Sequence, residues 1–122
     1  MWRDSALLLD MLLAAREVLQ FTSDLTQDQF QADSLRRSGT YYQLQTIGEA
    51  ASKISPDFKA AHPEIPWPPI IGLRHQLVHN YARINPDEIW NIIQIDVPHL
   101  ISQLEPHVPP DEQAPPSQEN PD

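Results

Sequence analysis

Apolar side chains recur every three or four residues along most of this 122-residue chain. Over residues 3–21 they form one stripe, which is the pattern of an amphipathic helix whose apolar face packs into a core. No run of alternating apolar and polar residues, and no Asn-Gly turn, indicates a strand. The sequence therefore predicts an all-α fold, an up-down bundle of four to five helices.

A second helix is expected soon after the first. Asp24 or Thr26 can cap it, because their side-chain oxygens can accept from the free N–H groups of a first helical turn. Its inner face would carry Phe30 and Leu35, and Gly39 would interrupt or end it.

The third helix is expected over residues 40–54. Three small residues would allow another helix to approach it closely: Gly48, Ala50 and Ala51. Glu49 is the one charged residue among them. It is either a solvated acid that pairs with Lys53 one turn later, or a supporting residue that orients a functional side chain across the bundle.

Prolines divide the second half of the chain, since thirteen prolines are too many for uninterrupted helices. Ser55 can cap a short helix that starts at Pro56. Four prolines within residues 63–69 then make an extended link, with Trp67 packed beneath it. The next helix is expected over residues 68–83.

The last helix is predicted to start at an Asn85 cap, with Pro86 in its first position. Pro98 should kink this helix, because proline offers no backbone N–H. Its inner face would hold eight apolar residues: Ile89, Trp90, Ile92, Ile93, Val97, Leu100, Ile101 and Leu104.

Acidic residues and prolines concentrate at the C-terminus. Residues 105–122 hold six Pro, five acids and no Lys or Arg, so we expect a disordered acidic tail after a helical domain of residues 1–104. Of the formal net charge of −9, the domain carries −4, from 12 acids and 8 bases. Such a domain is not a general nucleic-acid binder, and any contact with RNA must be local.

Other classes of protein are excluded by what the chain lacks. With no Cys and only 3 scattered Gly, it has no disulfide, no thiolate chemistry and no glycine-rich phosphate loop. No cofactor is expected. The apolar run 6–13 is interrupted by Asp10 and is too short to span a bilayer. We therefore expect a cytoplasmic protein that does not associate with membranes.

Six polar residues within a span of ten form the one group suited to catalysis: Arg74, His75, His79, Asn80, Tyr81 and Arg83. One hypothesis is a metal site, because His75 and His79 lie one helical turn apart. Its shell would need a further ligand from these: Glu49, His62 or His99. A second hypothesis is the polar outer face of a packed helix, with these residues toward the core: Leu73, Leu77, Val78 and Tyr81.

A third hypothesis is a ribonuclease site that needs no metal. An imidazole can take the proton from a ribose 2′-OH or protonate the leaving 5′-oxygen, and a guanidinium can hold the phosphate. On one helix Arg74 and His79 diverge by about 140°, whereas Arg74 and Tyr81 nearly align. Two copies of the helix, facing each other across a two-fold axis, could bring Arg74 and His79 into one cleft. This hypothesis therefore predicts a homodimer.

The arrangement of Arg74, His79 and Tyr81 resembles the Arg-x4-His-x-Tyr signature of the HEPN superfamily, in particular the HepT-like ribonuclease toxins. The similarity extends over about residues 43–104 in order and spacing. The stretches that carry it are IGEAASKIS (47–55), PEIPW (63–67), IIGLRHQLVHNYARI (70–84) and the run from Trp90 to Asp96-Val97-Pro98.

The resemblance implies a homodimeric, or larger, HEPN-like bundle that cuts cellular RNA without metal, as the toxin of a type II/VII-like toxin–antitoxin pair. Its partner would be a MntA-like nucleotidyltransferase antitoxin, which silences the toxin by transferring AMP to the motif tyrosine. Carried over to this chain, Arg74 and His79 are catalytic and Tyr81 accepts AMP. Asn80 and Glu49 would support them.

One position departs from the family pattern. The residue after the arginine is commonly Asn or Asp, and here it is His75, for which we expect a supporting or neutral role. The resemblance also admits an alternative, a non-catalytic HEPN companion that binds nucleotide or polynucleotide for a partner nucleotidyltransferase. A purely structural helical dimer is a third possibility, if packed side chains fill the cleft.

Overall fold

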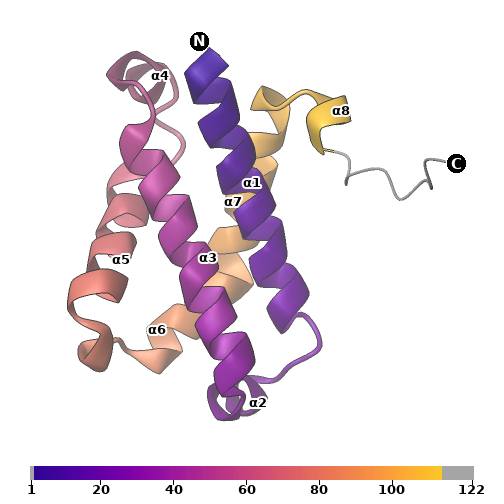
Figure 1. The fold of residues 1–122 in the computed structure, drawn as a ribbon, viewed down its shortest axis with the longest axis vertical. Helices are drawn as coiled ribbons and strands as arrows, with labels where there is room; N and C mark the ends of the chain where they lie inside the picture. Colours follow the sequence, from indigo (N-terminus) through magenta and orange to yellow (C-terminus); the bar gives the residue numbers. More distant parts are fainter. Residues whose placement is uncertain (1, 114–122) are drawn as a thin grey trace, which may run out of the picture.

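The computed structural model describes residues 2–113, and that part of the chain is an all-α bundle without strands (Figure 1). The α-helices are α1 (Trp2–Thr22), α2 (Gln27–Ala32), α3 (Ser34–Lys53), α4 (Pro56–Ala61), α5 (Trp67–His79), α6 (Pro86–Asn91), α7 (Val97–Leu104) and α8 (Pro110–Gln113). The other elements are the 3-10 helices η1 (Tyr81–Arg83) and η3 (Glu105–His107) and the π-helical segment η2 (Ile92–Asp96). The predicted all-α fold class is confirmed, although residues 2–113 form eight α-helices where four to five were expected.

The long helices α1, α3 and α5 and the continuous run from α6 to α7 alternate in direction, as in an up-down bundle (Figure 1). Helix α1 packs against both α3 and α7, and α3 packs in turn against α5. The apolar stripe of the first helix is buried as predicted, with Met11, Leu12 and Val18 fully enclosed. No helix within residues 2–113 has the length and hydropathy that crossing a membrane requires.

The boundary between the second and third helices differs from the prediction. Thr26 caps α2 in a reciprocal capping box, and Phe30 is fully buried, both as expected. However, α2 ends at Ala32 and the side chain of Asp33 accepts the Arg36 N–H at 3.0 Å, so that a new helix starts there. Leu35 then lies in the first turn of α3 and is 82% exposed, not on an inner face.

Gly39 neither interrupts nor ends a helix, because α3 runs through it. A Cβ atom at this position would come within 3.2 Å of the Phe21 ring of α1. The glycine therefore serves the packing of α1 against α3, and its cost to helix propensity is outweighed by tertiary contacts.

A second glycine brings α3 and α5 into closer contact. A Cβ atom on Gly48 would lie 2.2 Å from the Cβ of Arg74 and 3.1 Å from the carbonyl oxygen of Ile70. No side chain fits there without moving one helix. The close approach expected from the small residues of the third helix is thus confirmed, and its partner is α5.

The chain between α3 and α5 follows the predicted course. The Ser55 hydroxyl accepts the Phe58 N–H and caps α4, and Trp67 is buried with its indole N–H donating to the His62 carbonyl at 3.0 Å. Asn85 caps α6, as expected.

The predicted inner face of the last helix is buried or partly buried along the run from α6 to α7. Pro98 does not end this run. The π-helical segment η2 precedes it, and the Val97 N–H donates to the carbonyl of Ile92, five residues back. The wider π-helical turn thus lies directly before Pro98, which has no backbone N–H to donate.

The C-terminal segment is ordered further than the composition predicted. Residues 105–113 form η3 and α8, and Val108 is buried against the core. Arg16 of α1 pairs with Glu105 at 2.9 Å and donates to the side chain and carbonyl of Gln113. The disorder expected from residue 105 is therefore wrong for residues 105–113, because one apolar anchor and one cation hold an acidic segment. The remainder of the predicted tail lies outside the described residues.

The Gly48 contact yields a stability prediction. Gly48→Ala should lower the free energy of unfolding by about 1–3 kcal/mol in urea titration, because the added methyl group forces α3 and α5 apart. The matched control is Gly72→Ala on α5, where a Cβ atom would meet nothing within 4 Å. That variant should gain up to about 1 kcal/mol from helix propensity. Equal effects of the two substitutions would contradict the close contact.

Candidate active site

Arg74 lies where α5 meets α3, and its partner is Glu49. The Arg74 Nη2 atom is 2.7 Å from Glu49 Oε2, and the other carboxylate oxygen is 3.3 Å from Lys53 Nζ. Glu49 is thus both a partner for Lys53 and a neighbour of the motif arginine. The side chains of Arg74 and Glu49 are 37% and 43% exposed, so solvent reaches the pair.

An open hollow of about 300 Å³ adjoins this ion pair. Arg74, Glu49, Lys53 and the exposed Tyr42 all line it. Asp10 also lines the hollow, so two carboxylates accompany the two cations. A guanidinium can bind a phosphate with two parallel hydrogen bonds. A phosphate there would have to compete with the Glu49 carboxylate for Arg74.

His79 is the last residue of α5, and it is exposed. Its ring lies against that of His75, with centroids 4.4 Å apart. Within residues 2–113, neither a hydrogen bond nor an ion pair joins His79 to Arg74. This agrees with the divergence of about 140° expected for residues five apart on a helix. Within one copy of the chain, Arg74 and His79 therefore have different partners, Glu49 and His75.

Within residues 2–113, His75 and His79 have no third residue placed to complete a metal site with them. Among the residues that the structure describes, the group of three able to hold an ion is His62, Glu64 and His107. His62 directly follows α4, Glu64 lies in the link to α5, and His107 ends η3. Sequence reasoning considered His62 only as a ligand for the other pair.

The motif helix ends earlier than predicted, and this changes the position of Tyr81. Helix α5 stops at His79, Asn80 has a φ of −129°, and Tyr81 begins the 3-10 turn η1. The expected helix over residues 68–83 is thus wrong at its end, and the helical alignment of Arg74 with Tyr81 does not apply. Asn80 and Arg83 line a different hollow from that of Arg74.

Tyr81 instead packs on an aromatic residue of α3. Its ring meets Tyr41 edge-on, with centroids 5.6 Å apart, and Tyr81 remains 52% exposed. Tyr41 itself is buried against Phe30. Burial, together with the adjacent Tyr81, raises the pKa of Tyr41, so that this phenol stays neutral and acts as a packing platform. Sequence reasoning missed Tyr41, although the Tyr41-Tyr42 pair begins the predicted third helix.

Exposed apolar side chains lie beside these motif residues. Val78 was expected on the core side with Leu77, but Leu77 is fully buried and Val78 is 44% exposed. Val78 lies one helical turn after Arg74, on the same side of α5. Tyr42, which lines the hollow with Arg74, is 66% exposed. The helix is therefore not simply polar outside and apolar inside, as the packed-helix hypothesis requires.

Comparison with known proteins decides the family. Residues 11–106 match the family described as ribonuclease HepT-like, and this range contains Arg74, His79 and Tyr81. The chain belongs to the HepT-like ribonuclease family. The resemblance found in the motifs is confirmed over most of the described chain.

Several relatives of this chain have names that describe them as ribonucleases. A protein of Methanocaldococcus jannaschii that bears an RNase name is 35% identical over 100 residues, which cover 82% of this chain and 92% of the relative. A protein of Thermococcus cleftensis with the name ribonuclease HepT is 32% identical over 96 residues, covering 79% and 87%. A relative from Caldanaerobacter subterraneus with an RNase name is 36% identical over 61 residues, covering 50% and 54%. No solved structure matches this HepT-like chain.

The exposure of the Arg74–Glu49 pair predicts a small contribution to stability. A double-mutant cycle of Arg74→Gln and Glu49→Gln should give a coupling of about 0.2–1 kcal/mol in urea unfolding, as for other solvent-screened pairs. Arg74 would then be available to a substrate at little cost to the fold. A coupling above about 2 kcal/mol would instead make the pair a structural element.

Proposed function

We propose that this HepT-like chain is a metal-independent endoribonuclease whose site forms between two copies of the chain. The observation that carries the proposal is the family match over residues 11–106, in which Arg74, His79 and Tyr81 all reach solvent. Arg74 is the phosphate-binding cation, beside the hollow that it lines with Lys53. His79 transfers the proton.

The chemistry needs only these groups and the RNA itself. A base removes the proton from the ribose 2′-OH, and the 2′-oxygen attacks the adjacent phosphorus. The bond to the 5′-oxygen breaks, and an acid protonates that oxygen as it leaves. The products are a 2′,3′-cyclic phosphate and a 5′-hydroxyl. Arg74 stabilises the charge that builds on the phosphate oxygens in the transition state.

In this proposal, the arginine and the histidine of one site come from two different copies of the chain. Arg74 and His79 have different partners within one protomer, while a two-fold axis near α5 can set the arginine of one copy against the histidine of the other. The exposed Tyr42, Val78 and Tyr81 support this arrangement, since they give the site a partly apolar surface that a dimer would bury.

The exposed Tyr81 supports a toxin role controlled by AMP transfer. In the proposed reaction its phenolic oxygen attacks the α-phosphorus of ATP, pyrophosphate leaves, and the phenolic proton passes to a base of the partner nucleotidyltransferase. The Tyr41 ring holds Tyr81 in place from the protein side. The added phosphate would bring a negative charge to the RNA-binding face and repel the substrate.

RNA cleavage by the purified chain in excess EDTA tests this function. Wild type should cut and leave cyclic phosphate ends, and His79→Ala should lose about 10²–10⁴-fold in rate because it lacks the proton-transfer group. Arg74→Ala should lose comparably, whereas His75→Gln and Tyr81→Phe should retain most activity. His99→Ala, an exposed histidine of α7, is the matched control.

Intact mass must first show that Tyr81 carries no AMP. If the unmodified dimer then cuts no RNA, the non-catalytic companion of a nucleotidyltransferase replaces this proposal. In that case Arg74→Ala and His79→Ala would weaken nucleotide binding instead of abolishing a reaction.

Subunit mixing tests whether the site is shared. Heterodimers of Arg74→Ala with His79→Ala retain an arginine on one copy and a histidine on the other, so they should regain a substantial fraction of wild-type cleavage after unfolding and refolding together. The matched control mixes wild type with the Arg74→Ala, His79→Ala double variant, which leaves both groups on one copy. Control activity above that of the re-formed wild-type homodimers, with none in the test mixture, would place the whole site within a single protomer.

A further inference from the structure

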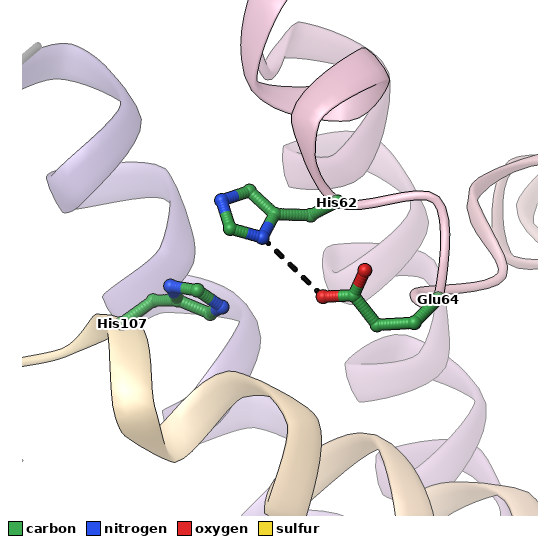
Figure 2. A group of neighbouring side chains, drawn as sticks. All are labelled: His62, Glu64 and His107. Atoms are coloured by element: carbon green, nitrogen blue, oxygen red, sulfur yellow. Dashed lines mark hydrogen bonds and ion pairs between the residues drawn. The ribbon is translucent and has the colours of Figure 1, made fainter.

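Two histidines and a glutamate from separate parts of the chain converge at one end of the bundle (Figure 2). His62 follows α4, Glu64 lies in the link that leads to α5, and His107 ends η3. One potential ligand atom from each residue lies within 4.8 Å of the others. The His62 Nδ1 atom is 3.3 Å from Glu64 Oε2.

The backbone around this cluster is held by its own hydrogen bonds. The Trp67 indole donates to the His62 carbonyl at 3.0 Å, and the Gln103 amide of α7 donates to the Glu64 carbonyl at 2.7 Å. Val108, next to His107, is buried in the core. The three side chains therefore project from fixed positions, which lowers the entropic cost of holding a ligand.

Phe58 of α4 forms an apolar wall beside both imidazoles. Its ring centroid is 4.3 Å from that of His62 and 5.4 Å from that of His107, while the two imidazole centroids are 4.3 Å apart. Both histidines are partly buried, whereas Glu64 is exposed. A ligand here would thus be enclosed on one side and open to water beside the glutamate.

We propose that His62, Glu64 and His107 bind one divalent transition-metal ion of the zinc class. Tetrahedral zinc with bonds of about 2.0–2.1 Å sets its ligand atoms about 3.4 Å apart. The His62 Nδ1 to Glu64 Oε2 separation of 3.3 Å already has this length. The other separations do not exceed 4.8 Å, so they would have to close by about 1.4 Å at most, which a rotation of the His107 side chain can supply.

The donor set selects the kind of ion. Two imidazole nitrogens and one carboxylate oxygen suit Zn²⁺, Ni²⁺ or Cu²⁺, whereas Mg²⁺ and Ca²⁺ prefer oxygen ligands throughout. A water molecule would take the fourth position, on the open side next to Glu64. The bound ion would link η3 to the segment between α4 and α5. It would act there as a structural ion that stabilises the position of the C-terminal segment. It would take no part in the RNA cleavage proposed for Arg74 and His79.

Zinc titration of the untagged full chain, stripped with EDTA and then freed of chelator, tests this site. Calorimetry should give one Zn²⁺ per chain, and added Zn²⁺ should raise the melting temperature. His107→Gln and His62→Gln should each weaken zinc binding at least about tenfold, because each removes one of three ligands. Co²⁺ in place of Zn²⁺ should show the visible absorption of a tetrahedral ion, and both variants should lose it.

Two controls use the same substitution elsewhere. His99→Gln, outside the cluster, should bind zinc as wild type does. The double variant His75→Gln, His79→Gln should also keep its zinc, since neither histidine belongs to the proposed metal site. The proposal does not rest on the ribonuclease function. Loss of binding in the double variant with retention in His107→Gln would overturn the proposal and assign the ion to α5. Absence of zinc binding by wild type would also overturn it. That result would leave the ribonuclease proposal standing, because RNA cleavage is tested separately in EDTA.

Discussion

The close contact of α3 with α5 at Gly48 is the constraint on which the candidate site depends. Because Gly48 has no side chain, the Cβ of Arg74 and the carbonyl of Ile70 can lie against the α3 backbone. Arg74 is then next to Glu49, one residue along α3, and the ion pair at 2.7 Å follows from the contact. A wider spacing of the two helices would leave the guanidinium without this neighbour.

The net negative charge of the chain bears on how the group of Arg74, Glu49 and Lys53 could bind RNA. A net charge of −9 opposes RNA in general, so the proposed function requires a local cation to bind the phosphate. Arg74 and Lys53 are two cations beside one hollow, and both pair with Glu49. In the proposed ribonuclease, a phosphate would have to displace Glu49 from these two cations. Exposed pairs of this type add little stability, so such an exchange costs the fold little.

Local signals predicted much of the fold. The caps formed by Thr26, Ser55 and Asn85 were found because each depends on one side chain and the next three residues. The apolar stripes of the first and last helices were also found, since periodicity is a property of consecutive residues. The error at Gly39 arose because packing against Phe21 of α1 outweighed what the neighbouring residues suggested. Leu35 was misplaced for a local reason, since Asp33 ends α2 and caps a new helix.

The sequence by itself determined the helical class, most helix starts and the family, through the ordered set of stretches around Arg74, His79 and Tyr81. Only the tertiary structure decided which groups meet: Arg74 with Glu49, Tyr81 with Tyr41, and His107 with His62. The physical reason is that such meetings depend on the rotation and spacing of packed helices. Those quantities are set by side-chain volumes at contacts such as Gly48, between residues far apart in the chain.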